Sequence, residues 1–265
     1  MHFVALGVSQ LLHRSWQTMS LPRFFIDLPL VPDTELPLPT DIAHHAVRVL
    51  RLRDGDELVV FNGQGGQFPA RLVVEGKSAT AQLGAFDARE AELPGRIVLA
   101  QAIPSGDKMD WVIEKAVEVG VAAIQPIAAT RCVLRLSGDR LEKRLAHWRR
   151  VVVAACEQCG RNRVPEVYAP LTPEQFLATT PVGAAPLRLM CDPDAQIRLT
   201  ELVQQRDISA GLELLVGPEG GWSPEEMALA MRYRVEAVQF GERVLRTETA
   251  GIALVSALSA KLGWI

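Results

Sequence analysis

From Arg96 onward, short apolar runs alternate with stretches of helical character, and this alternation is the strongest constraint on the fold. The strand-like runs cover residues 97–103, 121–127, 187–191, 212–216 and 235–240. Strands that alternate with helices build a largely parallel sheet whose faces the helices cover. The clearest helix spans about residues 139–159, where apolar positions recur at steps of four and three, and Gly160 is its expected end. Its apolar seam is Leu141, Leu145, Trp148, Val152, Ala155 and Cys159. We therefore expect an α/β domain.

The chain before this region has a different pattern, with short β-like runs broken by turn residues. The runs 57–62, 67–74 and 79–83 predict strands of a small, mostly β domain. The polar segment 87–95 ends in Pro-Gly, so we place a boundary there. The expected organisation is an N-terminal extension at residues 1–18, the small domain at 19–90 and the α/β domain at 91–265. Residues 1–18 lack the basic start and cleavage site of a secretory signal.

Composition excludes several classes of protein. At 48% hydrophobic and 22% charged residues the chain is typical of globular proteins. We expect no membrane span, because no apolar run approaches the roughly 18 residues needed to cross a bilayer. The four cysteines are too scattered for a secreted disulfide framework, so we expect a cytoplasmic protein. Cys156-x-x-Cys159 has no second cysteine or histidine pair, so we expect a structural role and no metal.

Positive charge is concentrated in residues 131–163. This tract has nine Lys or Arg against three Asp or Glu, whereas the whole chain has a net charge of −3. Along the expected helix the basic side chains mostly lie off the apolar seam. Such a tract indicates a polyanionic partner on one face, and a solvated helix face is the alternative that charge alone leaves open.

The stretch LLVGPEGGWSPEE, residues 214–226, joins a strand to a helix. Ser223, Pro224 and Glu226 have the order of a capping box with proline at the first helical position. The turn 217–222 therefore lies at the carboxyl edge of the sheet, where α/β proteins bind ligands. Its glycines allow a ligand to approach the backbone, although a tight turn without a ligand remains the alternative.

The ligand of this turn is not expected to be a nucleotide phosphate. The sequence contains neither a P-loop nor a G-x-G-x-x-G fingerprint, and the carboxylate of Glu219 would repel a phosphate. A neutral or cationic ligand fits better. A second loop, residues 240–250, places Arg246 and Glu248 before a helix that carries no charge until Lys261. Capping of this helix is the alternative role for the hydroxyls of Thr247 and Thr249. The helix must be buried in its own domain or covered by a partner subunit.

Three motifs in this order resemble the RsmE family: CEQCGRNRVPEV at 156–167, LLVGPEGGWSPEE at 214–226 and GERVLRTETAGIAL at 241–254. LPRFF and HHAVRVLRLRDGDELVVFNGQG resemble the family's N-terminal domain, so the resemblance runs from Met19 almost to the end. It implies a SPOUT-class methyltransferase that uses S-adenosylmethionine to methylate N3 of a uracil in 16S rRNA of the 30S subunit. The implied fold is α/β, with a SPOUT-type trefoil-knotted C-terminal domain and a small N-terminal PUA-like β-barrel domain. The resemblance also implies a homodimer whose active sites are completed across the interface.

The resemblance implies roles for individual residues. Candidates for catalysis are Arg246 or Arg163, as the group that stabilises the uracil anion, and Glu248 as the base. The expected cofactor-binding residues are Leu189, Met190, Val216, Gly217, Pro218, Glu219, Gly220, Gly221, Phe240, Gly241, Val244, Leu245, Arg246, Thr247 and Ala250. The expected RNA-binding residues are Arg23, Arg48, Arg51, Lys108, Arg161, Asn162 and Arg163. For residues 161–163 the alternative is a role at the helix end, and for residues 44–53 it is a solvated β surface.

Two other functions stay open at this point. A non-catalytic RNA-binding or ribosome-assembly factor could keep the fold and lose the cofactor, although intact glycine-rich and Arg-Thr loops oppose that. A knotted methyltransferase could instead act on ribose 2′-oxygens or on tRNA. The CEQCGRNR stretch and the N-terminal domain favour the uracil enzyme.

Overall fold

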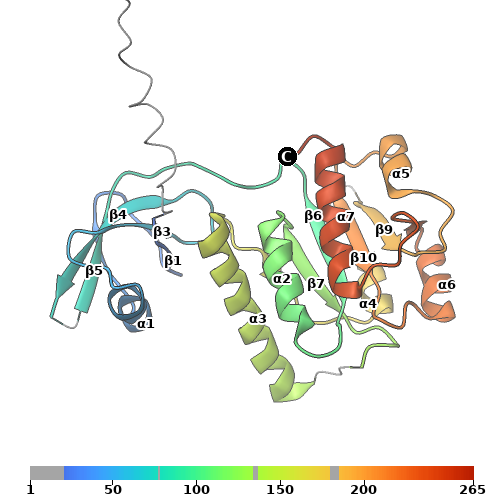
Figure 1. Ribbon diagram of the computed structural model, residues 1–265, viewed down its shortest axis with the longest axis horizontal. Coiled ribbons are helices and arrows are strands. Elements are labelled where there is room, and N and C mark those ends of the chain that lie inside the picture. Colours follow the sequence, from blue (N-terminus) through green and yellow to red (C-terminus); the bar gives the residue numbers. More distant parts are fainter. Residues whose placement is uncertain (1–20, 77, 134–136, 180–184) are drawn as a thin grey trace, which may run out of the picture. The chain divides into compact units, whose positions relative to one another are not determined.

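The computed structural model describes residues 21–76, 78–133, 137–179 and 185–265. It separates into two compact units, Met1–Arg89 and Glu90–Ile265, each with its own set of elements (Figure 1). The expected extension at residues 1–18 lies outside the described ranges.

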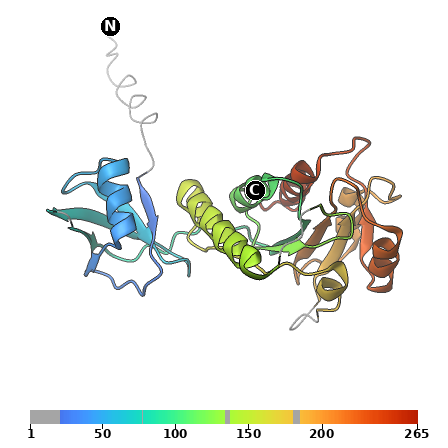
Figure 2. The ribbon, with the colours of Figure 1, turned by 90° about the horizontal axis from the view of Figure 1, so that it is seen from below.

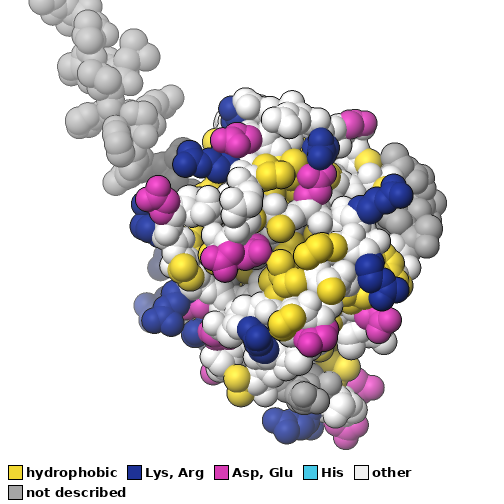
Figure 3. Space-filling view, turned by 90° about the vertical axis from the view of Figure 1, so that its right-hand side faces the viewer, with side chains coloured by type: hydrophobic (Ala, Val, Ile, Leu, Met, Phe, Trp, Pro, Cys, Tyr) yellow, Lys and Arg dark blue, Asp and Glu magenta, His cyan; other side chains and the backbone are white. Residues whose placement is uncertain are grey.

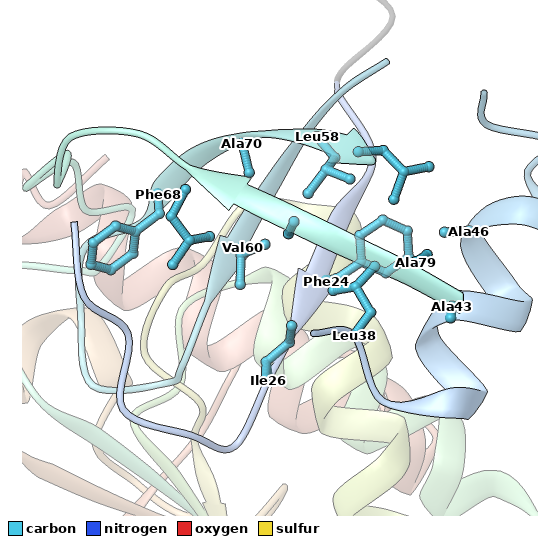
Figure 4. Close-up of a cluster of buried hydrophobic side chains, with 13 residues drawn as sticks. Phe24, Ile26, Leu38, Ala43, Ala46, Leu58, Val60, Phe68, Ala70 and Ala79 are labelled. Carbon is cyan, nitrogen blue, oxygen red and sulfur yellow. The ribbon is translucent and has the colours of Figure 1, made fainter. Parts of the chain in front are cut away.

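The first unit is built on a five-stranded mixed sheet. Its strands are β1 (Arg23–Phe25), β2 (Glu35–Pro37), β3 (Glu57–Phe61), β4 (Phe68–Glu75) and β5 (Ser78–Leu83), in the order β1-β3-β4-β5-β2. β1 runs parallel to β3, and the other pairs are antiparallel. Alternate residues of β4, Phe68, Ala70 and Leu72, are buried, as the period of a half-buried strand requires. They join a core in which Phe24, Ile26 and Leu58 also point inward (Figure 4).

A helical segment in the first unit was not expected. Helix α1 (Thr40–His44) continues into a π-helical turn, η1 (His45–Val49), where the sequence analysis considered a β surface. Ala43 and Ala46, three positions apart, are buried against the sheet, whereas His44 and Arg48 are exposed. This spacing matches one face of a helix and does not match the alternation of a strand.

The described residues of the second unit form six strands, and every pairing among them is parallel, which confirms the predicted α/β sheet. The strands are β6 (Ile97–Ala102), β7 (Ala123–Ile127), β8 (Glu166–Val167), β9 (Leu187–Cys191), β10 (Leu212–Val216) and β11 (Glu236–Val238). Their order is β11-β9-β10-β6-β7-β8. All residues of the central strand β6 are buried, as expected for a strand covered on both faces.

In the described ranges six helices accompany this sheet: α2 (Lys108–Glu118), α3 (Gly138–Cys159), α4 (Pro173–Leu177), α5 (Leu199–Gln205), α6 (Pro224–Arg232) and α7 (Thr247–Lys261). α2 and α7 lie on one side of the strands, and α4 and α6 on the other (Figure 2). Capping boxes start α4 at Thr172 and α6 at Ser223, and Gly160 ends α3 with a φ of 86°; the box at Ser223 and the end at Gly160 were predicted. On α3, however, Cys156 is the buried cysteine and Cys159 is half-buried, because the apolar face drifts along the helix.

Helix α7 is apolar almost all round, as the sequence predicts, and it packs closely on the sheet. A Cβ atom on Gly251 would lie 3.0 Å from Leu99 Cδ1 of β6, so a side chain there would force Leu99 to shift. Leu254, Val255 and Leu258 are buried, whereas a stripe on another side of the helix is half-exposed. That stripe consists of Ile252, Ala253, Ser256 and Ala257. Within the described ranges, each helix is too short or too polar to cross a membrane.

Candidate active site

A cavity of about 680 Å³ opens where the carboxyl ends of β9 and β10 meet the start of α7. This is the edge at which parallel α/β sheets bind ligands, and the volume suits a small molecule. Its walls come from the segment after β7, the end of β9, the turn after β10 and the loop into α7. The lining residues are Arg131, Cys191, Asp192, Pro193, Asp194, Val216, Gly217, Pro218, Glu219, Gly221, Trp222, Met227, Val244, Leu245, Arg246, Thr247 and Ala250.

The turn after β10 is held by the start of α6. Ser223 N donates a hydrogen bond to Glu226 Oε2 at 2.8 Å, and Glu226 N donates to Ser223 Oγ at 3.2 Å. The other carboxylate oxygen of Glu226 accepts from Thr130 N at 2.8 Å. Since Glu226 is 6% exposed, one buried carboxylate fixes both the helix start and the segment that follows β7.

Arg131, in that segment, is a site residue that the sequence analysis missed. Its Nη1 donates to the carbonyl oxygen of Gly220 at 2.6 Å, and its side chain lines the cavity. A Cβ atom on Gly220 would lie 3.4 Å from the aliphatic carbons of Arg131, so the two residues are in contact. The available signal was its place after β7, at the same edge of the sheet as the glycine-rich turn.

The first residue of α7 links three elements. Thr247 Oγ1 donates to Gly217 O at 2.5 Å and accepts a hydrogen bond from Gln101 Nε2 of β6 at 3.0 Å. The alternative role, capping by Thr247 or Thr249, does not occur, because α7 already begins at Thr247 with Arg246 at the N-cap position. The Thr247 hydroxyl therefore fixes the cavity wall to the sheet and does not cap the helix.

A charged cluster borders the turn. Glu219 Oε1 accepts hydrogen bonds from Ser105 N at 3.1 Å, Ser105 Oγ at 2.6 Å and Lys108 Nζ at 3.1 Å. Partial burial raises the pKa of Glu219, but the hydrogen bonds from Ser105 and Lys108 outweigh it and hold the pKa at about 2. The same bond raises the pKa of Lys108. Lys108 Nζ also lies 3.6 Å from Glu248 Oε2, so an ammonium joins two carboxylates beside the cavity at neutral pH.

The wall from β9 lies further along the chain than predicted. Leu189 and Met190 are each 1% exposed inside the strand, and the cavity is lined instead by the next four residues, 191–194. Phe240 and Gly241 line a smaller adjoining cavity that shares Cys191 and Leu245 with the main one. Burial, followed by the charge of Asp192, raises the pKa of Cys191 to about 11, so its thiol is protonated at neutral pH.

The predicted catalytic residues occupy different places. Arg246 lines the cavity, and Glu248 lies beside Lys108. Arg163 is outside the cavity lining; its side chain is 58% exposed, with Nε 3.2 Å from Glu90 Oε1. Among the described residues, no group of three or more His, Cys, Asp or Glu is arranged to hold a metal ion.

Two residues expected to contact RNA are instead inside the second unit. Arg161 is 3% exposed, and its guanidinium pairs with both carboxylate oxygens of Glu92. It also donates to the carbonyl oxygens of Val117 and Val121, at 3.0 and 2.9 Å. Asn162 has no exposed surface. The Arg161 side chain therefore holds the segment before β6 to the end of α2, and neither residue presents an RNA-binding surface.

In the first unit the three predicted RNA-binding arginines differ in exposure. Arg23 Nη1 donates to Gln67 Oε1 at 2.6 Å, and its guanidinium lies 4.9 Å from the centre of the Phe61 ring. Arg48 and Arg51 are exposed, at and just after the end of η1. Arg51 has a φ of 59°, so the chain reverses there in a left-handed conformation.

The chain matches family models in both units. An RNA methyltransferase domain matches residues 91–259, and an RNA methyltransferase PUA domain matches residues 38–83. Ribosomal RNA small subunit methyltransferase E of Synechocystis is 35% identical over 226 residues, which cover 85% of this chain and 73% of the relative. The Buchnera aphidicola protein of the same name is 30% identical over 92% of this chain and 97% of its own. The chain belongs to the ribosomal RNA small subunit methyltransferase E family.

Solved structures agree with this family assignment. A ribosomal RNA small subunit methyltransferase E from Neisseria gonorrhoeae, bound to S-adenosyl methionine, is 37% identical with a TM-score of 0.83. The alignment covers 91% of this chain and 97% of that one. A Legionella pneumophila protein in complex with the cofactor SAM is 32% identical, with the same TM-score and coverage. The predicted resemblance to the RsmE family and the predicted fold class, α/β with a PUA-like domain, are therefore confirmed.

Proposed function

We propose that this protein uses S-adenosylmethionine to methylate N3 of a uracil in 16S rRNA of the small ribosomal subunit, in the cytoplasm. The observation that carries the proposal is the cavity formed by the glycine-rich turn and the first turn of α7, in a chain of the methyltransferase E family. A family member from Neisseria gonorrhoeae has been solved with this cofactor.

The residues around the cavity fit a cofactor that carries a sulfonium and an ammonium group. Asp192, Asp194 and Glu219 supply negative charge, which complements those cations. Glycines at 217 and 221 bring bare backbone to the wall, and Val216 adds apolar surface to it. We assign cofactor binding to residues 216–221, 244–247 and Ala250, as predicted, and add residues 191–194. When bound, the cofactor supplies an activated methyl group, so the protein contributes mainly position and electrostatics.

The chain must also remove a proton from the substrate. Uracil N3 is protonated at neutral pH and has to lose this proton before its lone pair can take the methyl group. Glu248 is the candidate base: its Oε2 is buried, and its cationic neighbour among the described ion pairs is Lys108, with Nζ at 3.6 Å. Arg246, and with it Arg131, lines the cavity and would stabilise the negative charge that develops on the uracil. Because N3 lies on the pairing edge, the base must be unpaired or flipped out.

We propose that the active form is a homodimer and that α7 passes through a loop to form a trefoil knot. The half-exposed stripe of α7 and the exposed side chains of Val244, 78%, and Met231, 70%, leave apolar surface for a partner subunit. Figure 3 shows the side of the second unit that carries α5 and α6, where apolar side chains gather between charged ones. Arg163 can act in catalysis only across such an interface, since within one protomer it does not line the cavity.

We assign RNA binding by the small domain, residues 19–90, to the exposed arginines Arg48 and Arg51. The domain at 91–265 would carry out the methyl transfer. Lys108 contributes through Glu219, at the edge of the cavity.

The test uses the purified protein, tritiated S-adenosylmethionine and 30S particles from a strain that lacks the activity. The rRNA is then digested and the labelled nucleoside identified; 3-methyluridine is the expected product. Label in a ribose-methylated nucleoside would refute the N3 assignment. Calorimetry on the same sample separates the remaining outcomes. Cofactor binding without methyl transfer would refute the assignment of 16S rRNA as the substrate. Absence of cofactor binding would refute the assignment as a methyltransferase.

A further inference from the structure

The positive charge of residues 131–163 is sorted by the structure into paired and unpaired groups. Arg161 and Arg163 pair with Glu92 and Glu90, which lie outside this tract. Arg144 Nη1 lies 3.6 Å from Asp107 Oδ1. Arg131 donates to the carbonyl oxygen of Gly220 at the cavity. The other described cations of the tract lie on α3 and are exposed: Arg140, Lys143, Arg149 and Arg150. In the described part of the chain, no carboxylate lies within ion-pair distance of these four.

Three of these four cations share one face of α3 with Arg144 and His147. We call this set the basic stripe: Arg140, Lys143, Arg144, His147 and Arg150, which follow each other at steps of three, one, three and three residues. At 3.6 residues per turn this spacing keeps them on one side of the helix. Trp148 and Val152 are buried on another side. Ten residues separate the ends of the stripe, which is therefore about 15 Å long at 1.5 Å per residue.

The stripe is connected to the border of the cavity through α2, which packs beside α3 in both ribbon views (Figures 1 and 2). His147 Nε2 lies 2.6 Å from Asp110 Oδ2, in the first turn of α2. Lys108, in the same turn, donates to Glu219 of the glycine-rich turn. The middle of the stripe therefore lies one helix away from the cavity wall.

We propose that the basic stripe of α3 binds phosphates of the rRNA strand that flanks the target uracil. This inference rests on the proposed function and adds a surface to it. A polyanion fits because several unpaired cations occupy about 15 Å of one helix face. A protein partner fits less well, because the stripe lacks the buried aromatic or aliphatic anchors that dominate protein interfaces.

The test is the salt dependence of binding to 30S particles. In the triple variant Arg140→Gln, Lys143→Gln, Arg150→Gln, each lost phosphate contact should lower the slope of log Kd against log salt by about 0.7–0.9. Three contacts give a change of about 2–3, with binding weakened about tenfold or more near 0.1 M salt. The matched control is Arg198→Gln, Arg232→Gln, Arg234→Gln, which removes the same charge from exposed positions of the same unit. The slope of the control should differ from the wild-type slope by no more than the value of one lost phosphate contact, about 0.7–0.9.

The outcomes separate this inference from the proposed function. Both variants should bind S-adenosylmethionine as the wild type does, which also shows that they are folded. At saturating 30S the stripe variant should keep the wild-type kcat and show only a raised KM. A wild-type slope in the stripe variant, or an equal loss of slope in the control, would overturn the inference while methylation by the wild type stands. Failure of the wild type to methylate 30S would instead remove the proposed function.

Discussion

Replacing Thr247 with valine tests the link between the cavity wall and the sheet. Valine keeps the shape of threonine but removes the hydroxyl that donates to Gly217 O and accepts from Gln101 Nε2. Gln101 Nε2 keeps its bond to Ala102 O at 3.0 Å, so the main loss is at the carbonyl of Gly217. The site is nearly closed to water, since Thr247 is 6% exposed. A buried polar group without a partner costs about 1–3 kcal/mol, and we expect Thr247→Val to lower the free energy of unfolding by about 2 kcal/mol.

Two measurements check this magnitude. Thermal unfolding should show a decrease in Tm of about 4–8 °C, since domains of 150–250 residues shift by about 2–4 °C per kcal/mol. Calorimetry with S-adenosylmethionine should show a Kd raised about tenfold if 1.4 kcal/mol of the cost falls on the bound form. Thr247→Ser keeps the hydroxyl and should retain the cofactor affinity. Thr249→Val, an exposed position in the same helical turn, is the matched control and should change neither quantity. Wild-type Tm and Kd in Thr247→Val would refute the reasoning.

Three further predictions concern charged side chains. Arg131→Gln should lower kcat for methyl transfer. The difference in kcat from wild type should shrink as the pH approaches the pKa of uracil N3, because the substrate is then already ionised. A difference that stays constant across the pH profile of kcat would indicate a structural role only. For Glu219, a folded pKa of about 2 against an ordinary 4.5 means that its stabilisation is present above pH 4.5 and is lost as the pH falls towards 2. The difference in Tm between wild type and Glu219→Gln should therefore vanish near pH 2, and a constant difference would contradict this. Arg161→Met leaves the carboxylate of Glu92 without its partner and should lower the free energy of unfolding, measured with urea, by about 3–5 kcal/mol. The folded variant should bind 30S particles with the wild-type affinity. A selective loss of 30S affinity would restore the RNA-binding prediction.

The features that the sequence predicted well depend only on residues close together in the chain. The capping box at Ser223 involves residues three positions apart, so its geometry follows from local order. The parallel sheet follows from apolar runs that match β9 and β10 residue for residue. Such signals do not depend on where the rest of the chain goes.

The features that the sequence did not predict depend on distant partners. Arg161 was expected to bind RNA because its neighbours are basic, but its carboxylate partner lies 69 positions earlier. The hydroxyl of Thr247 meets Gln101, 146 positions away, and so does not serve as a cap. In both cases the side chain alone allowed two destinations, and only the tertiary fold selected one.

The helical segment of the first unit was not predicted for another reason. Residues 45–49 include two valines, which favour strands, and the segment packs on the core through the buried Ala43 and Ala46 and the partly buried Ile42 and Val47. Tertiary packing outweighs local propensity in so short a segment.

Glu226 links the start of helix α6 to the cavity, so a substitution at this one position would affect both. Each of its two oxygens accepts one backbone N–H, from Ser223 and from Thr130, and a glutamine there would offer one acceptor where two are used. A change at this position would therefore alter the beginning of α6 and, through Thr130, the placement of its neighbour Arg131 in the cavity. The two loops therefore constrain each other, both through the carboxylate of Glu226 and through the hydrogen bond from Arg131 to the carbonyl oxygen of Gly220.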